Sequence, residues 1–413
     1  MIGKMKALSI VMCLILIMTA CTPGQNSGGS GDKVKITWWD TMTSDASVAA
    51  INKIISEYEE AHPNITIERT YVSYSDIKTK LLLGSIGNQG PDIVWIDSAD
   101  HQTFAAAGVL ADLTKEIEKW GQAKHYIEGP WSSTVYNGRN YGVPVGSNNL
   151  ALYYNTDLFK TAGLQPPTNW DELQAAAKKL TNKNIFGFAV SAVKTEEGTF
   201  QFLPFVLQAG SDIPDFDSPG TLKALTMLTD MVNEGLMSKD VITQKQSDTA
   251  TQFAAGKVAM MVNGTWQIPF LQKNAKVNWD VVKLPSDVQS ATVLGGENWA
   301  ISEASKHKDI AFDVIQFANE PERLKELLKT NGRLPSRSDL LQDPFWQEDR
   351  QMKVFADSMQ VAKARAYGPN YASISEAIQT MLQEALTGAK TPEAAVKSAG
   401  AIIASLLQEQ QEE

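Results

Sequence analysis

Tryptophan, carboxylate and amide side chains occur in this sequence where strands and turns are expected to end, which is where a small ligand could reach them. A saccharide presents many hydroxyl groups and flat apolar C–H faces, so its site needs aromatic surfaces beside groups that donate and accept hydrogen bonds. This mixture favours a sugar site. The candidates are Trp39 and Asp40 at the end of the first predicted strand, Asp97 and His101 after the third, Trp266 after an Asn263-Gly264 turn, and Gly296, Glu297 and Asn298 at a Gly-Gly pair.

The first predicted elements alternate between strand and helix. Residues 34–39 alternate and are rich in β-formers, which predicts a strand, and the helical spacing from Val48 to Tyr58 predicts a helix that ends before Pro63. A strand over 65–71 and a helix through Ile77 and Leu81 follow. Residues 92–97 form a nearly continuous apolar run, which is typical of a strand buried on both faces of a parallel sheet. Trp38 and Trp95, within these strands, are predicted to be core residues.

The second half of the chain has more helix. Ser218-Pro219 is an N-cap followed by proline at the first helical position, and Gly235 occupies a C-cap position. A strand over 258–262 should end at Asn263-Gly264, and another should span 293–301. Everything after Pro335 is helical in pattern. The 413 residues exceed one compact core, so we predict an α/β fold of two lobes, with parallel-rich sheets flanked by helices.

Sequence motifs for catalysis and for metal or cofactor binding are missing. The four histidines form no HExxH pair, and the chain has no CxxC, no GxxxxGK[ST] phosphate loop, no GxGxxG and no GxSxG. We therefore expect no metal, no cofactor and no enzymatic activity. The two carboxylates of a glycoside hydrolase are paired in space rather than in sequence, so a surface glycoside hydrolase stays open as an alternative.

The N-terminus has the layout of a secretory signal. Lys4 and Lys6 precede an uncharged, mostly apolar run that is shorter than the ~20 residues of a spanning helix. The ending Met18-Thr19-Ala20-Cys21 resembles the bacterial lipobox, in which the cysteine is acylated. We expect residues 1–20 to be a signal peptide and residues 21–32, rich in Gly and Ser, to be a lipid anchor on Cys21 with a flexible tether. This places the protein at the outer face of a cell membrane.

Composition limits the partners. The chain has 37 basic and 47 acidic residues, whereas a nucleic-acid partner calls for a basic surface, so we expect no nucleic acid to bind. Cys13 lies inside the signal, which leaves the mature body without a disulfide, a Cys-based metal site or a thiol nucleophile. We expect a monomer.

Four segments together resemble the extracellular solute-binding family that includes the maltose-binding protein. They occur in the family's order and span nearly all of the mature chain. The segments are Gly90-Pro91-Asp92-Ile93-Val94-Trp95-Ile96-Asp97, Tyr141 to Phe159 with Pro167 to Leu173, Phe253 to Trp266, and Gly295-Gly296-Glu297-Asn298-Trp299-Ala300-Ile301-Ser302.

The resemblance implies two lobes that close on a ligand by hinge bending and deliver it to the permease of an ABC importer. Matching segments place chain crossovers near Val145-Gly146, Thr292-Val293 and Leu334-Pro335. Lobe 1 is then 33–145 plus 292–334, and lobe 2 is 146–291 plus 335–413.

The resemblance also implies site residues. Trp266 matches the family's sugar-stacking position, and Ser147 and Asn148 stand at the first crossover. Arg333, beside the third crossover, and Tyr371, before a helix, are further candidates, as are Phe200 and Gln201. Asn148 stands where the maltose-binding member has a carboxylate. An amide still bonds to hydroxyls, but this departure leaves the exact ligand open.

Other ligands on the same scaffold must be weighed. A phosphate or sulfate would recruit arginines and backbone amides, whereas the candidate loops carry tryptophans, amides and carboxylates. The preferred ligand is a sugar, most of all an oligosaccharide. A polyamine suits the acidic residues and is the main alternative. A peptide is another alternative ligand on the same scaffold. A pure adhesion module is an alternative of a different class, but it would have no reason for interlobe closure.

Overall fold

The computed structural model describes residues 33–74, 76–87 and 89–412. The predicted signal peptide, Cys21 and the tether lie outside the described residues. No helix among those residues has the length and apolar character required to span a membrane.

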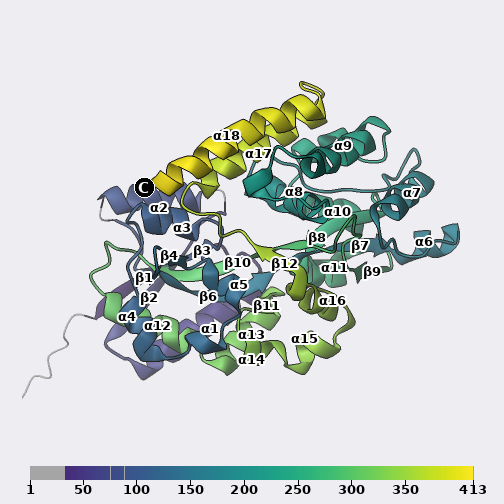
Figure 1. Ribbon diagram of the computed structural model, residues 1–413. Coiled ribbons are helices and arrows are strands. Elements are labelled where there is room, and N and C mark those ends of the chain that lie inside the picture. Colours follow the sequence, from purple (N-terminus) through teal and green to yellow (C-terminus); the bar gives the residue numbers. More distant parts are fainter. Residues whose placement is uncertain (1–32, 75, 88, 413) are drawn as a thin grey trace, which may run out of the picture.

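The larger of the two main sheets has the strand order β11-β6-β10-β3-β1-β2, with β12 paired to β10 (Figure 1). β1 runs parallel to β2 and β3, whereas β10 runs antiparallel to β3 and β6. The strands are β1 (Val34–Asp40), β2 (Ile65–Tyr71), β3 (Ile93–Asp97), β6 (Gly142–Asn148), β10 (Thr292–Ile301), β11 (Leu334–Pro335) and β12 (Ala362–Ala364), and a separate hairpin joins β4 (Val135–Tyr136) to β5 (Arg139–Asn140).

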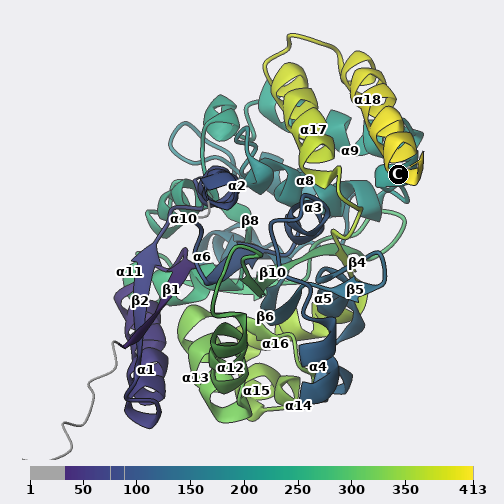
Figure 2. The ribbon, with the colours of Figure 1, turned by 90° about the vertical axis from the view of Figure 1, so that its left-hand side faces the viewer.

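Helices cover both faces of this sheet (Figure 2). Buried residues of α1, α12 and α13 pack on one face around Trp38, Trp95 and Trp299, whose side chains are fully buried in edge-to-face contact. Residues of α2 and α3 cover the other face. The helices associated with this part are α1 (Asp45–Ala61), α2 (Ile77–Gly87), α3 (His101–Ala106), α4 (Thr114–Trp120), α5 (Glu128–Ser132), α12 (Lys308–Ala318), α13 (Pro321–Asn331), α14 (Ser338–Leu341) and α15 (Pro344–Glu348).

The smaller sheet has the order β8-β7-β9 and is antiparallel throughout. Alternate residues of β7 face two different cores: Leu152 joins the core of α7, α8, α9, α17 and α18, whereas Tyr153 faces α10, α11 and α16. The elements are β7 (Leu150–Asn155), β8 (Met260–Gly264), β9 (Trp279–Val282), α6 (Thr156–Ala162), α7 (Trp170–Leu180), α8 (Glu196–Gln208), α9 (Pro219–Asn233), α10 (Gln246–Ala254), α11 (Ile268–Asn274), α16 (Arg350–Ser358), α17 (Tyr371–Leu386) and α18 (Pro392–Glu412).

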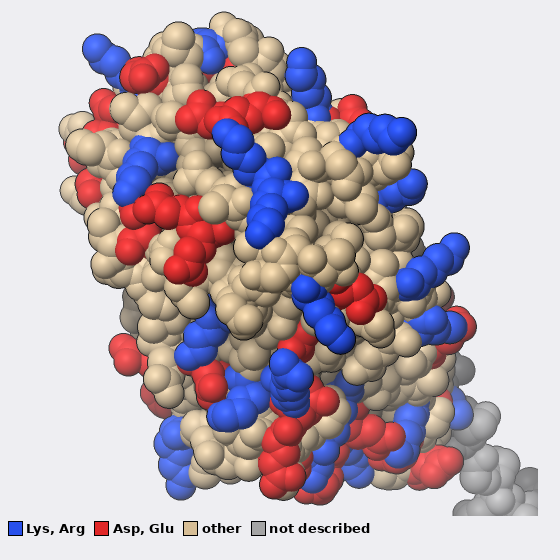
Figure 3. Space-filling view, turned by 90° about the vertical axis from the view of Figure 1, so that its right-hand side faces the viewer, with Lys and Arg blue, Asp and Glu red and all other residues tan. Residues whose placement is uncertain are grey.

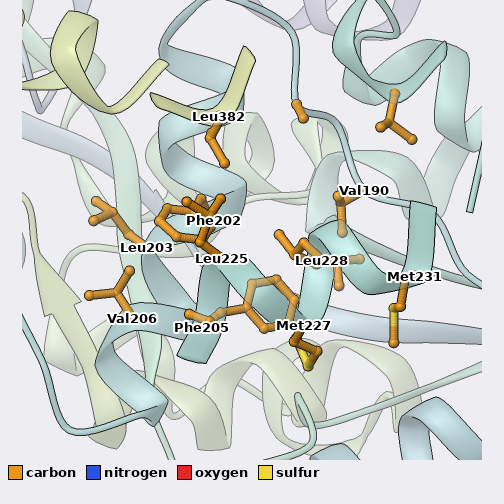
Figure 4. Close-up of a cluster of buried hydrophobic side chains, with 14 of the residues drawn as sticks. Val190, Phe202, Leu203, Phe205, Val206, Leu225, Met227, Leu228, Met231 and Leu382 are labelled. Atoms are coloured by element: carbon orange, nitrogen blue, oxygen red, sulfur yellow. The ribbon is translucent and has the colours of Figure 1, made fainter. Parts of the chain in front are cut away.

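The core between α8, α9 and α17 is built from aliphatic, methionine and phenylalanine side chains. Figure 4 shows Phe202 and Phe205 of α8 facing Leu225 and Leu228 of α9, with Leu382 of α17 beside them. These side chains are buried almost completely. Because α8 carries apolar residues on most of its surface, it packs between neighbouring helices and holds its N-terminal turn in a defined place. Short 3₁₀ turns connect other elements, at η1 (Ala123–His125), η2 (Ile213–Asp215), η3 (Lys239–Ile242), η4 (Thr265–Gln267) and η5 (Met359–Val361).

The predicted two-lobed α/β class is confirmed, but the sheets are mixed rather than dominated by parallel pairs. The expected turn at Asn263-Gly264 is wrong, because both residues belong to β8 and pair with Ala151 and Leu150. The prediction that everything after Pro335 is helical missed β12, a strand too short to leave a period-2 pattern. The predicted lobe ranges remain a prediction.

Surface charge is mixed on the face that Figure 3 displays. Lysine and arginine side chains lie among aspartates and glutamates there, with uncharged surface between them. That face has no broad basic field of the kind that a nucleic-acid backbone would require.

Candidate ligand-binding site

A cavity of about 150 Å³ lies between elements of the large sheet and elements packed on the small sheet. The large sheet contributes residues at or just beyond the ends of β1, β3 and β6 and from the middle of β10, and the small-sheet side contributes the N-terminal part of α8, the start of α10, and η4. The lining residues are Thr41, Tyr74, Asp97, Asn148, Glu196, Glu197, Phe200, Gln246, Trp266, Gly296, Glu297, Arg333 and Arg365.

Trp266 and Phe200 form the aromatic part of the lining. The two ring centroids are 6.2 Å apart and the rings are tilted by 41°. Trp266 sits in η4, directly after β8 ends at Gly264, and its six-membered ring lies over that glycine. A Cβ atom on Gly264 would come within 1.9 Å of the ring, so only glycine leaves room for this indole orientation. Phe200 is positioned by the packed helix α8.

Glu297 and Arg333 form an ion pair beside the aromatic rings. Arg333 Nη2 donates to Glu297 Oε1, and the Arg333 guanidinium lies 5.4 Å from the centre of the Trp266 ring. Both side chains are mostly buried, at 12% and 13% exposure. Glu297 Oε2 and Arg333 Nε and Nη1 are buried and find no hydrogen-bond partner among residues 33–74, 76–87 and 89–412. Burial raises the pKa of Glu297, although the adjacent Arg333 charge opposes this shift.

Arg365 connects the two sides of the cavity. Its Nη2 donates to Asp97 Oδ1 at the end of β3, at 3.0 Å, and its Nη1 donates to Glu196 Oε1 at the start of α8. Tyr371 and Ser375 of α17 donate to the same glutamate. The Arg365 guanidinium also lies 4.6 Å from the centre of the Phe200 ring.

The environment of Asp97 keeps its carboxylate charged. Burial alone would favour protonation, but the charge of Arg365, the Ala99 N–H and the Tyr74 hydroxyl together hold the pKa of Asp97 below its usual value. Tyr74 donates to Asp97 Oδ2 at 2.7 Å, and the Ala99 N–H donates to Oδ1 at 2.9 Å. The neighbouring carboxylates likewise raise the pKa of Arg365 well above its ordinary value, against the opposing effect of burial.

Six of the predicted site residues line this cavity. They are Asp97, Asn148, Trp266, Gly296, Glu297 and Arg333. Gly296 has a φ of +141°, and a Cβ there would meet the Gly146 carbonyl oxygen at 2.2 Å, so only glycine allows β10 and β6 to approach this closely. Asp97, Asn148, Gly296 and Glu297 come together because β3, β6 and β10 are neighbours in one sheet.

The other six predicted residues lie outside the lining. Asp40 is buried in an ion pair with Arg69, and Trp39 packs against the core under α2 and α3. His101 is fully buried against Gly142, where a Cβ would meet its ring at 2.5 Å. The remaining three are held by protein partners: Ser147 by the Ser336 hydroxyl, Asn298 by Ser133, and Tyr371 by Glu196. Each therefore contributes to the framework behind the site.

Sequence reasoning missed several lining residues. Thr41, Tyr74, Glu196, Glu197, Gln246 and Arg365 were not among its candidates, although Phe200 was. Gln201, weighed beside Phe200, points away and donates to the Val262 carbonyl oxygen. Arg365 follows a strand that left no pattern, and the two glutamates resemble ordinary first-turn residues of a helix, which suit the helix dipole.

Two further groups offer free hydrogen-bonding capacity to a ligand. Glu197 Oε2 accepts the Gln246 N–H at 2.9 Å, and no ion pair joins Glu197 to a basic side chain within the described ranges. Asn148 lies beside Phe200, because a Cβ on Gly295 would touch both side chains. Together with the aromatic rings, the site presents apolar faces surrounded by donors and acceptors, which can hold a small polyhydroxylated solute. No cluster of three or more metal-binding side chains occurs in residues 33–74, 76–87 and 89–412.

Residues 53–354 match the family described as bacterial extracellular solute-binding protein. Among curated relatives, a multiple sugar-binding protein of Streptococcus mutans is 25% identical over 327 residues, which is 74% of this chain and 76% of the relative. An uncharacterized lipoprotein of Streptomyces antibioticus is 24% identical over 350 residues, covering 80% of this chain and 76% of the relative.

A solved structure has a closely similar fold. It is an ABC transporter solute-binding protein from Thermotoga lettingae, bound with α-D-tagatose. Its TM-score is 0.84 at 29% sequence identity, and the alignment covers 91% of this chain and all of that one.

Proposed function

Because this chain belongs to the bacterial extracellular solute-binding protein family, we propose that it captures a sugar between its two lobes and delivers it to the permease of an ABC importer. The proposed ligand is a saccharide, preferably an oligosaccharide. The names of two similar proteins state a sugar ligand. The Streptococcus relative is a multiple sugar-binding protein, and the Thermotoga structure contains bound tagatose.

The observation that carries this proposal is the aromatic pair Trp266 and Phe200 next to the unpartnered polar atoms of Glu297 and Arg333. An aromatic ring offers a flat apolar surface to the C–H face of a sugar, while a carboxylate and a guanidinium satisfy its hydroxyls. A polyamine has neither the flat face nor the hydroxyls. A protonated polyamine accepts no hydrogen bonds, so the two unpartnered donors of Arg333 would stay unsatisfied, and both arginines would repel its charges.

The decisive experiment is a thermal-shift screen of the mature protein against tagatose, lactose, maltotriose, glucose, galactose and spermidine. A ligand that binds only the folded state raises its stability by RT ln(1 + [L]/Kd). We expect a concentration-dependent rise in Tm with at least one saccharide and none with spermidine. A response to spermidine alone would favour the polyamine alternative. Chromatography of the incubated oligosaccharides should recover them intact, and accumulation of cleavage products would instead favour a glycoside hydrolase.

We further propose that the lobes close about three chain crossovers. β6 ends at Asn148 in the large sheet and β7 begins at Leu150 in the small sheet, which supports a first crossover close to the predicted Val145-Gly146. β10 is the second, because Thr292 bonds to Leu150 while Ile301 pairs with β3. β11, paired with Gly146 and Ser147, precedes the third. The ion pairs of Arg365 with Asp97 and Glu196 would then join the lobes when they are closed.

The proposed location is the outer face of a cell membrane, with Cys21 as the acylated residue. The likeness to a Streptomyces lipoprotein supports this assignment, and so does the lipobox-like ending of the N-terminal segment. The partners we propose are the sugar, the membrane through the lipid anchor and the permease subunits, with the protein itself acting as a monomer.

A further inference from the structure

The charges of the cavity are unequal. Four carboxylates line it, from Asp97, Glu196, Glu197 and Glu297, against the two guanidinium groups of Arg333 and Arg365. Lys78, which is close enough to influence the pKa of Asp97, is itself paired with Asp100 at 2.6 Å. The lining therefore carries a surplus of negative charge.

Arg365 is already engaged by two carboxylates of the protein. Its Nη1 and Nη2 atoms donate to Glu196 and Asp97, and Nε donates to the Leu294 carbonyl oxygen at 3.3 Å. The side chain is only 2% exposed. A ligand carboxylate or phosphate would therefore have to reach a buried guanidinium and compete for its charge with Asp97 and Glu196, two carboxylates that already pair with it.

The second arginine suits a hydroxyl better than an anion. Arg333 has two buried donors without partners, and Glu297 has one buried acceptor without a partner on the same ion pair. A sugar hydroxyl both accepts and donates, so one hydroxyl or two adjacent ones can satisfy both residues. A ligand carboxylate only accepts. It would satisfy Arg333 alone and be repelled by Glu297.

Glu197 adds a carboxylate that no basic side chain neutralises through an ion pair in the described part of the chain. One of its oxygens accepts the Gln246 N–H, as described above, and its side chain is half-buried at the cavity wall. Burial raises its pKa above the ordinary value of a glutamate, and the Gln246 N–H and the nearby charge of Lys245 oppose this shift only in part. A protonated amine on the ligand would supply an ion-pair partner for this carboxylate.

We propose that the cavity selects sugars without an acidic group, so that neutral sugars and protonated amino sugars bind in preference to uronic acids and sugar phosphates. This inference rests on the proposed function, since it concerns which saccharides the same site accepts. The selection arises from the pairing of buried Arg365 with two carboxylates, from the donor–acceptor pair of Arg333 and Glu297, and from the carboxylate of Glu197, which forms no ion pair among the described residues.

The test compares sugars that share one ring and differ in a single neutral, cationic or anionic substituent. Calorimetric titrations at pH 7 use glucose, glucosamine and glucuronate, then galactose, galactosamine and galacturonate, with glucose 6-phosphate as the phosphorylated probe. The screen is repeated with the acidic analogue of whichever neutral sugar binds most tightly. We expect each acidic sugar to bind at least about tenfold more weakly than its neutral parent, and each amino sugar to bind more tightly than its acidic counterpart.

Two variants test whether the charge selection arises from the cavity. Glu197→Gln should narrow the ratio of amino-sugar to acidic-sugar affinity measured in the same variant. Glu393→Gln, which removes an exposed carboxylate from α18, should leave that ratio as in the parent protein. If both variants narrow the ratio equally, the selection comes from overall charge and the assignment to the cavity is wrong.

The failures of the two proposals are distinguishable. If acidic sugars bind as tightly as their neutral parents, or more tightly, the charge selection is overturned while sugar binding stands. If no neutral, amino or acidic saccharide binds, the proposed function itself is overturned.

Discussion

The six-membered ring of Trp266 lies directly over Gly264: a Cβ atom on Gly264 would be 1.9 Å from Cζ3 and 2.2 Å from Cη2 of the indole. Real Cβ atoms do not approach other atoms so closely, so any side chain at position 264 must displace the ring. Gly264 ends β8 and Trp266 belongs to the 3₁₀ turn that follows it. The strand end thus sets the orientation of the aromatic surface in the cavity.

Gly264→Ala should therefore weaken sugar binding by moving the Trp266 indole, although Gly264 itself is not a lining residue. We expect an affinity loss of roughly tenfold or more, measured by calorimetric titration, because the indole leaves its position. Gly87→Ala is the matched control, since only the Gln89 side chain comes within 4 Å of its added Cβ. In a Trp266→Phe background, which lacks the second ring of the indole, Gly264→Ala should reduce the affinity for the sugar much less. Equal losses in both backgrounds would show that Gly264 acts independently of the indole.

Trp266→Ala should remove the aromatic surface itself. Base–aromatic stacking, the nearest calibrated comparison, is worth ~1–3 kcal/mol per ring, which corresponds to an affinity loss of roughly tenfold to a hundredfold. Because the Trp266 side chain is only half-buried, the Tm of the Trp266→Ala protein should differ little from that of the parent protein. A core tryptophan would instead cost about 3–5 kcal/mol of stability. A large fall in Tm with unchanged affinity would contradict a binding role.

Arg365→Gln should destabilise the protein and separate its lobes. The substitution leaves Asp97 and Glu196 as buried carboxylates without a cationic partner, and breaking a buried ion pair costs about 3–5 kcal/mol. We expect a lower denaturant midpoint and, without ligand, a larger radius of gyration in small-angle scattering. The control is Arg350→Gln, which removes the 81% exposed partner of Asp280. An unchanged radius would show that Arg365 does not hold the lobes together.

His101 should make the protein sensitive to mild acid. Burial lowers the pKa of His101 to about 3 in the folded chain, against 6.5 when exposed. Below pH 6.5 the unfolded chain therefore binds a proton that the folded chain does not, so stability falls as the pH falls. The expected contribution is a loss of about 2 kcal/mol between pH 7 and pH 5.

Denaturant unfolding of His101→Gln and His101→Met at several pH values tests this assignment. Both variants should lose the His101 contribution to the slope of the unfolding free energy against pH, whatever their absolute stability. His307→Gln, at a partly exposed position, should keep the full slope. A wild-type slope in both His101 variants would assign the acid sensitivity to another group.

Cys21→Ser should release the protein from the membrane, because the proposed acyl chains contribute ~0.8 kcal/mol per buried CH₂ group and the serine cannot carry a thioether-linked lipid. Cell fractionation should find the variant in the soluble extracellular fraction with an unchanged Tm. Cys13→Ser, inside the segment predicted to be removed, is the matched control and should remain with the membrane. Retention of the Cys21 variant would contradict the lipobox assignment.

The sequence by itself determined most of the local elements. Ser218 caps α9 and accepts the Thr221 N–H, and Gly235 ends it at a φ of +71°, as the residue types predicted. The apolar run before Asp97 forms a buried strand. Such features depend on capping, backbone preference and hydrophobic period, which act over a few neighbouring residues.

Only the tertiary structure decided which polar residues face the cavity. Asp97 and His101 are four positions apart, yet Asp97 lines the cavity and His101 packs against Gly142 behind it. Asp97 and Arg365 are 268 positions apart and form one ion pair. No local pattern encodes such a contact, because it depends on how β3, α8 and the segment after β12 pack together. The periodicity of the chain thus determines the elements, and long-range packing determines the charge and shape of the site.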